Sequence, residues 1–149
     1  MILTDSPLGP LGADATDGAI TRLIWGQGGT LTQGPLFDQA RAELAAYFAG
    51  DLQNFTLPLA PRGSAFQQDF YTALCAIPFG ETRTYGDLAG ELNVSAQAIG
   101  QACGANPIAI FIPCHRVLAA NGLGGFSGAG GIEAKVTLLR LEGAGSLLI

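Results

Sequence analysis

Apolar and polar residues alternate at the beginning of the chain and then change to a helical spacing. Alternating stretches bounded by Pro and Gly turn signals predict strands at 1–4, 8–13 and 19–25. The apolar residues then recur along one side of a predicted helix over 36–49, which is followed by an extended segment at 55–59. This order of elements indicates a small α/β unit at the start of the chain.

Three patterns that begin helices follow in the second part of the chain. Ser64 and Gln67 have the spacing of a capping box, in which two residues satisfy each other's free backbone N–H groups. Thr84 and Asp87 repeat this spacing, and Ser95 is a candidate N-cap. The predicted helices run over 64–77, 84–92 and 96–105.

The last two of these helices form either a helix-turn-helix or an ordinary helical hairpin. The turn at 92–94 is short enough for both, and spacing alone favours the hairpin. The residues of 96–105 are nearly all small, and each Gly in a helix costs about 1 kcal/mol relative to Ala. A helix of this composition packs poorly in a core but lets its backbone approach another surface, such as a DNA groove. We therefore keep the helix-turn-helix as a hypothesis.

The chain ends with an apolar strand, a glycine-rich loop and a helix. Residues 108–112 are a tight apolar run that predicts a strand, and it leads directly into Cys114. The loop covers 121–131, and the helix over 132–142 stops at Gly143. The helical spacing predicts that its buried side includes Ile132, Val136 and Leu139.

Composition and charge limit the classes of function. With 149 residues, the chain forms one domain or two small lobes that share a core. The net charge is −5, from seven Lys and Arg against twelve Asp and Glu, which argues against an extended electrostatic grip on nucleic-acid phosphates. No apolar run approaches the roughly 20 residues of a membrane helix, and no secretory signal begins the chain. We expect a cytoplasmic protein without a membrane partner.

The cysteines and the histidine supply the candidate chemistry. Three cysteines without paired spacing and one histidine support neither a disulfide framework nor a zinc site, so we expect no metal and no cofactor. Cys114 is followed directly by His115, a nucleophile beside a base. Neighbouring side chains in extended backbone point to opposite faces, which favours a relay through water over a direct hydrogen bond. A carboxylate in the last turn of a helix, as at Glu142, is stabilised by an imidazole partner. The alternatives are a histidine that satisfies a buried carbonyl and a solvated Glu142.

These residues lie within a longer set of motifs. The segment 112–117 reads Ile-Pro-Cys-His-Arg-Val, and it resembles the active-site signature of the O6-alkylguanine-DNA alkyltransferases, also called methylated-DNA–protein-cysteine methyltransferases. Further matching motifs lie in family order at 64–67, 77–82, 84–86, 104–107 and 141–143. The resemblance covers nearly the whole chain and is weakest before about residue 35.

The resemblance implies a reaction and assigns roles in it. Cys114 is expected to accept an alkyl group from O6 of guanine in DNA, with O4 of thymine as a second candidate atom, and to act only once. His115 is the implied base acting through water, and Glu142 orients it. Tyr85 is implied to bind the extrahelical guanine and favour its flipping, and Asn106 to brace the turn before the reactive strand.

The resemblance also implies contacts with the flipped base. The backbone carbonyls of Cys114 and Val117 are expected to bind the guanine amino group, and Ser127 to hold the base near O6. Ala109 and Phe126 stand where some relatives carry proline and tyrosine, which trims the pocket. The absent tyrosine hydroxyl reduces stabilisation of the leaving guanine.

The implied partner is double-stranded DNA that carries O6-alkylguanine, bound by a monomer through the minor groove. The residues expected to contact DNA are Tyr85, Gly86, Ser95, Ala96, Gln97 and Arg116. Gln97 stands where many family members place an arginine that fills the gap left by the flipped base. We therefore expect weaker DNA binding and a shallower salt dependence than in an arginine-bearing relative.

The implied fold has two lobes. Residues 1–60 are expected to form an α/β lobe with a small antiparallel sheet, similar to ribonuclease H. Residues 61–149 form a mainly helical lobe that carries the helix-turn-helix and Cys114. Three other functions stay open: an alkyltransferase-like lesion binder, which would lack the acceptor cysteine; a cysteine hydrolase, which would need an oxyanion hole; and a helix-turn-helix regulator, which would use more Arg and Lys.

Overall fold

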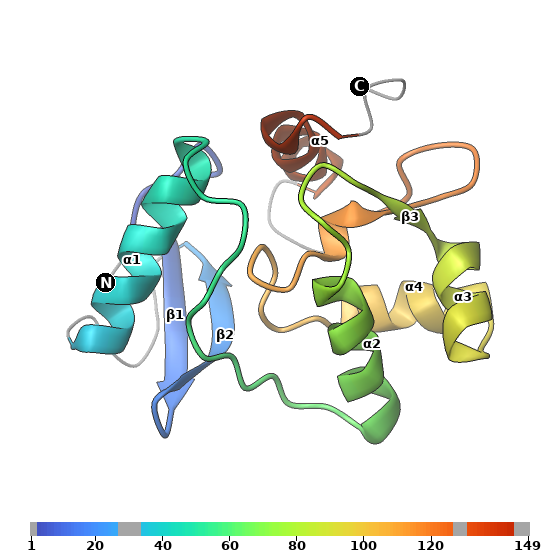
Figure 1. Cartoon of the computed structure of the whole chain (residues 1–149), viewed down its shortest axis with the longest axis horizontal. Helices are drawn as coiled ribbons and strands as arrows, with labels where there is room; N and C mark the ends of the chain where they lie inside the picture. The colour runs from blue at the N-terminus through green and yellow to red at the C-terminus, as the bar shows by residue number, and fades with distance from the viewer. Residues whose placement is uncertain (1–2, 27–33, 127–130, 145–149) are drawn as a thin grey trace. The chain divides into compact units, whose positions relative to one another are not determined.

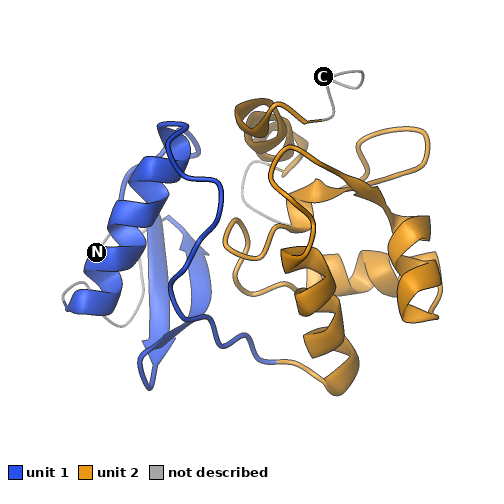
Figure 2. Cartoon of the chain, viewed as in Figure 1, with its two compact units in different colours: residues 1–62 blue, residues 63–149 orange. Residues whose placement is uncertain are grey.

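The computed structural model describes residues 3–26, 34–126 and 131–144 (Figure 1). The chain divides into two compact units, residues 1–62 and 63–149 (Figure 2). The first contains a small antiparallel sheet and one helix, and the second is mainly helical. This confirms the predicted fold class. In the part of the chain that the structure describes, no helix is both long and apolar enough to cross a membrane.

A β-hairpin and one helix form the first unit. Strands β1 (Leu11–Thr16) and β2 (Ala19–Trp25) pair in antiparallel fashion. Both residues of the connecting turn, Asp17 and Gly18, have positive φ, as required by the tight turns that suit the twist of a hairpin. Helix α1 (Pro35–Phe48) follows, with a proline at its start.

The strand predictions for the first unit are only partly right. In the described part of the predicted strand at 1–4, Thr4 forms an isolated bridge with Leu11, and the strand predicted at 8–13 begins later, at Leu11. The segment at 55–59 pairs only through a bridge between Ile20 and Leu59. Pro10 lies just before the observed start of β1 and Pro58 interrupts the extended segment, and a proline cannot donate a ladder hydrogen bond.

In the described part of the second unit, the chain forms four α-helices, one short 3-10 helix and two very short strands. The helices are α2 (Ala65–Cys75), α3 (Tyr85–Leu92), α4 (Ala96–Gly104) and α5 (Gly131–Glu142). Helices α2, α3 and α4 contact one another (Figure 1). Strand β3 (Arg83–Thr84) pairs in parallel with β4 (Val117–Leu118), which joins the start of α3 to the segment after Cys114.

The helix starts lie where the caps predict them. Both capping boxes form, with the Ser64 and Thr84 hydroxyls accepting hydrogen bonds from backbone N–H groups. The Ser95 hydroxyl accepts from Ala98 N at 3.1 Å and begins α4. Asn93 ends α3 in the left-handed conformation, φ 57°, and turns the chain toward α4.

The segment before Cys114 is not the predicted strand. It is a compact turn, with hydrogen bonds from Phe111 N to the Ala109 carbonyl and from Ile112 N to the Ile108 carbonyl, both 2.9 Å. Cys114–Arg116 then form one turn of 3-10 helix, η1. Cys114 and His115 are therefore not in extended backbone, and the argument that places their side chains on opposite faces does not apply.

Helix α5 buries only part of the predicted face, because Leu139 is buried but Val136 is only partly buried. Ile132 is 43% exposed, whereas Lys135 is 0% exposed together with Leu138 and Leu139. The helix packs through Leu139 on Leu118 of β4. The buried face predicted from the apolar spacing is rotated relative to the observed one. The reason is that Lys135, which the pattern counts as polar, lies on the buried side.

Candidate active site

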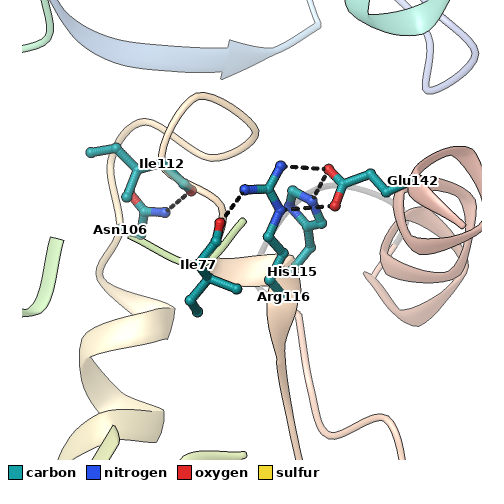
Figure 3. Close-up of polar contacts among 6 residues, drawn as sticks. All are labelled: Ile77, Asn106, Ile112, His115, Arg116 and Glu142. Atoms are coloured by element: carbon teal, nitrogen blue, oxygen red, sulfur yellow. Dashed lines mark hydrogen bonds and ion pairs between the residues drawn. The ribbon is translucent and has the colours of Figure 1, made fainter. Parts of the chain in front are cut away.

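Asn106 ties the end of α4 to the residues just before Cys114. Its amide nitrogen donates to the Ile112 carbonyl at 2.9 Å (Figure 3), and its amide oxygen accepts from Ile108 N at 3.1 Å. Both ends of the side chain are therefore used, and the turn between them is closed. The structure places Asn106 at the turn that it was expected to brace.

The backbone at this turn is strained. Ile110 has φ +73° and is buried, and a β-branched residue rarely adopts this conformation. Such strain costs about 1–3 kcal/mol and persists only where the surroundings hold it. The Asn106 contacts and the buried neighbours of Ile110 supply that support. The turn ends in the hydrogen bond from Cys114 N to the Ile112 carbonyl, 2.8 Å, which fixes the start of η1.

Cys114 lines a cavity of about 390 Å³. The other lining residues are Tyr85, Gly100, Cys103, Gly104, Gly125 and Phe126. The Cys114 side chain is nearly covered, at 4% exposure. Burial raises its thiol pKa, and the Asn106 amide and the charge on Lys135 oppose that shift without cancelling it. The resting thiol is protonated at neutral pH, so a base must remove its proton before it reacts.

His115, Arg116 and Glu142 form a buried polar cluster that joins η1 to the end of α5. His115 Nε2 lies 2.7 Å from Glu142 Oε2 (Figure 3). Arg116 contacts the same carboxylate through Nε at 2.8 Å and Nη2 at 3.0 Å, and its Nη1 donates to the Ile77 carbonyl at 2.7 Å. The structure therefore brings Glu142 and His115 together across 27 residues of sequence.

The cluster favours one protonation state of His115. Burial lowers the pKa of the imidazole, the Glu142 carboxylate raises it, and the charges on Arg116 and Lys135 lower it again. The net direction is downward, so the ring is neutral at neutral pH. A carboxylate only accepts hydrogen bonds, which assigns the proton to Nε2. Nδ1 is buried, has no hydrogen-bond partner among the described residues, and can accept a proton.

The burial of Arg116 argues against the expectation that it contacts DNA. The residue is 6% exposed, and its guanidinium is bound to Glu142 and to the end of α2. A phosphate contact would require breaking a buried, bidentate ion pair. The motif alone could not show this, because it carries no information about the carboxylate 26 residues later.

Tyr85 and Phe126 both line the Cys114 cavity, whereas Ala109 is buried and does not. A Cβ atom at Gly124, where φ is +71°, would lie 2.8 Å from the Tyr85 ring and hydroxyl. Only glycine therefore lets this loop approach the tyrosine. Ser127 lies outside the described residues.

The other residues expected to contact DNA lie on α3 and α4. Gly86, Ser95, Ala96 and Gln97 are exposed at or near the starts of the two helices. The Ser95 hydroxyl already serves as the N-cap of α4, so only its outer surface is free for a further contact. Among the described residues, no group of three or more His, Cys, Asp or Glu side chains could hold a metal ion.

Family models match both units. The model described as "6-O-methylguanine DNA methyltransferase, DNA binding domain" matches residues 65–144, and the model described as its "ribonuclease-like domain" matches residues 1–61. The chain belongs to the O6-methylguanine DNA methyltransferase family. The implied activity, methylated-DNA–protein-cysteine methyltransfer in direct-reversal DNA repair, is confirmed by this membership.

Individual relatives agree with the family assignment. A methylated-DNA–protein-cysteine methyltransferase of Methanosarcina acetivorans is 49% identical over 111 residues, which cover 72% of this chain and 70% of the relative. The Mycobacterium leprae protein of the same name is 42% identical over 93% of this chain and 88% of its own. A crystal structure of Mycobacterium tuberculosis OGT in complex with DNA superposes with a TM-score of 0.83 at 40% identity, covering 93% and 90% of the two chains.

Two residues of the methyltransferase site escaped the sequence interpretation. Cys103 lines the same cavity as Cys114, and burial raises its thiol pKa to about 12. Lys135 reaches the site from α5 and contacts the Val117 carbonyl at 2.7 Å. The signal for Lys135 was its helical spacing from Leu138, Leu139 and Glu142, which puts it on their face.

Proposed function

We propose that this chain repairs O6-alkylguanine in DNA by moving the alkyl group irreversibly onto Cys114. The observation that carries the proposal is the arrangement of Cys114 in a cavity, directly before a neutral histidine whose Nδ1 is free and whose Nε2 is held by Glu142. This arrangement supplies a nucleophile, a proton acceptor and a group that orients the acceptor.

The reaction balances with these groups alone. The Cys114 thiol gives its proton to His115 Nδ1 through a bridging water, and the Glu142 carboxylate stabilises the imidazolium. The thiolate attacks the alkyl carbon in line, forming a sulfur–carbon bond while the carbon–O6 bond breaks. The electron pair leaves on the guanine, which takes the proton back from the His115 imidazolium through the bridging water, so the histidine is neutral again. The thioether has no route back to a thiol, so each molecule acts once.

The target base has to leave the duplex for this chemistry. The cavity of about 390 Å³ beside Tyr85 offers a place for the extruded base. We propose that the start of α3 and the small-residue surface of α4 dock in the minor groove, with Gln97 at the gap left by the base. Close approach of a protein surface is typical of minor-groove binding that unstacks a base step.

The proposed role of Tyr85 rests on the same cavity. Burial raises the pKa of its phenol, as does the neighbouring Cys103 thiol, so the hydroxyl keeps its proton near neutral pH. A protonated phenol can donate a hydrogen bond to the extruded guanine. We propose further that the chain acts as a monomer, because the cavity, the nucleophile and the base all come from the second unit of one chain.

Intact-mass measurement after mixing with a duplex that carries one O6-methylguanine tests the proposal. The expected result is a gain of one methylene, located on the Cys114 peptide and saturating at one per protein. Cys103→Ser is the matched control, since it removes the other thiol of the cavity and should leave the gain intact. Cys114→Ser should abolish it while lesion binding persists.

Lesion binding by the unaltered protein without any mass gain would instead support an alkyltransferase-like lesion binder. A gain on Cys103 that survives Cys114→Ser would show that the acceptor is misassigned.

A further inference from the structure

Lys135 is a charged residue in the interior that the alkyl-transfer scheme above does not use. It lies in α5 and is 0% exposed. Its Nζ donates to the Val117 carbonyl at 2.7 Å and to the Gly125 carbonyl at 3.0 Å, and it lies 5.9 Å from the centre of the Tyr85 ring. A buried ammonium held in this way is expensive unless something compensates its charge.

Among the residues that the structure describes, none supplies a carboxylate hydrogen-bond partner to Lys135. The titratable groups that face it, among the residues that the structure describes, are Tyr85 on α3, Cys103 on α4, and Cys114 and His115 on η1. The one buried carboxylate nearby, Glu142, is already engaged by Arg116 and His115. With Glu142 and Arg116 opposite in charge and His115 neutral, the cluster has one positive charge left over, at Lys135.

We propose that Lys135 is a positioning residue that serves as the fixed counter-charge of the Cys114 thiolate. The ammonium is held by the carbonyls of Val117, three residues after Cys114, and of Gly125 in the cavity wall. It therefore stays in place when a base enters the cavity and displaces water from it. When the thiol gives its proton to His115, the total charge of the cluster does not change, and the buried ammonium stabilises the new thiolate without an ion entering from water. This role rests on the proposed function of Cys114 as acceptor.

The electrostatic directions agree with this geometry. Lys135 lowers the pKa of Cys114, and Cys114 in turn opposes the lowering of the Lys135 pKa by burial. Lys135 also lowers the pKa of His115, so it does not favour the imidazolium. Lys135 therefore stabilises the Cys114 thiolate and opposes the charged form of His115.

The test measures the reactivity of Cys114 toward iodoacetamide across pH, read by mass spectrometry on the Cys114 peptide. This probe needs neither DNA nor methyl transfer, so its outcome is separate from that of the proposed function. Lys135→Gln removes the charge and keeps a hydrogen-bond donor, and Lys135→Met removes both. Arg140→Met is the matched control, because it removes a positive charge from an exposed position on the same helix.

The expected result is a displacement of the rate–pH profile of both neutral variants upward by about one pKa unit, a tenfold loss of rate at each pH below the plateau. The plateau keeps its height, and Arg140→Met keeps the profile of the unaltered protein. Lys135→Arg, which restores the charge, should move the profile back. A profile that keeps its position in Lys135→Gln, or a lowered plateau without displacement, overturns the proposal.

A second measurement covers the case in which the neutral variants do not fold. The ε-carbon signal of Lys135 in the unaltered protein must report an ammonium over the pH range in which Cys114 becomes reactive. A neutral amine in that range overturns the proposal, since it could not compensate a thiolate.

Discussion

The two units bury different kinds of side chain. In the first unit, the buried residues of the described part are all apolar or aromatic, as in Leu11, Phe37 and Leu44. In the second unit, four polar or charged residues are buried: His115, Arg116, Lys135 and Glu142. All four lie on η1 or α5, around Cys114. The first core is explained by apolar burial alone, whereas the second includes groups that apolar burial does not explain.

This difference separates stability from function. Burying an ion pair removes two charges from water, and the attraction between them returns little or no net stability. Apolar side chains of the same volume would hold η1 against α5 at least as well. Stability therefore does not explain why the second unit buries these charges, and we expect substitutions in the two units to fail in different ways.

Arg116→Met should give the largest loss of stability and tests the charged core. It leaves the buried Glu142 carboxylate without its guanidinium partner, and removing one partner of such a pair costs about 3–5 kcal/mol. The pKa of His115 should rise, because Arg116 lowers it. Urea unfolding and NMR titration of the imidazole measure the two effects.

The double variant Arg116→Met/Glu142→Leu is the control for this prediction. It removes both charges and should recover part of the lost stability while leaving His115 without its orienting carboxylate. A single variant as stable as the unaltered protein would show that the pair does not control the fold of η1.

Leu44→Ala tests the apolar core of the first unit. Leu44 is fully buried in α1, and truncation of such a residue costs about 2–5 kcal/mol through lost burial and the cavity left behind. The rate of methyl transfer by the folded fraction should stay unchanged, because no residue of the Cys114 cavity comes from this unit. Thermal unfolding and single-turnover kinetics at a temperature where the variant is folded make the measurement. A slowed transfer step would break the separation between the units.

Helix starts could be predicted from the sequence, whereas the conformation of the segment before Cys114 and the buried side of α5 could not. The caps at Ser64, Thr84 and Ser95 were correct because each depends on hydrogen bonds within three residues. The strand predicted at 108–112 was wrong because Asn106 closes that segment into a turn with a positive φ at Ile110. A single amide thereby overrides the strand preference of a run of β-branched residues.

The candidate site shows the same limit. The motif around Cys114 named the nucleophile and the base, and the resemblance named Glu142 as their partner. It could not show that Arg116 shares this carboxylate or that Lys135 lies in the interior, since each depends on packing between segments far apart in sequence. Charged residues at buried positions are rare, so a pattern-based interpretation places them outside.

Acid should affect the two units in different pH ranges. Burial lowers the pKa of His115 in the folded protein below the 6.5 of the unfolded chain. At a pH between these two pKa values the unfolded chain binds more protons than the folded one. The free energy of unfolding therefore falls as pH drops below 6.5. The pKa of Glu43 on α1 is also lowered, but for a different reason. Burial raises this pKa, and hydrogen bonds from Gln39, Thr56 and Leu57 outweigh the effect of burial. Its contribution is present above pH 4.5 and is lost as pH falls through the lowered pKa.

Urea unfolding at a series of pH values measures the free energy of unfolding in each of these two pH ranges and so separates the two contributions. His115→Asn should flatten the dependence that begins near 6.5, and Glu43→Gln should change only the part below 4.5. Slopes are compared and not absolute stabilities, because His115→Asn also alters the contact with Glu142. If the pH dependence of stability near 6.5 persists in His115→Asn, another titrating group is responsible for it.

Gln97→Arg should have the smallest effect on stability and tests where the second unit places its positive charge. Of its four cations, Arg83, Arg116, Lys135 and Arg140, two are buried, and none lies on α4. Position 97 is exposed at the start of α4, so stability should change by no more than about 0.5 kcal/mol.

DNA affinity should rise, and the slope of log affinity against log salt should steepen by about 0.9 for one added phosphate contact. Titrations of a lesion duplex at several salt concentrations measure that slope. An unchanged slope with tighter binding would instead indicate that the arginine stacks in the gap left by the base without contacting phosphate. An unchanged affinity would mean that α4 does not face the DNA.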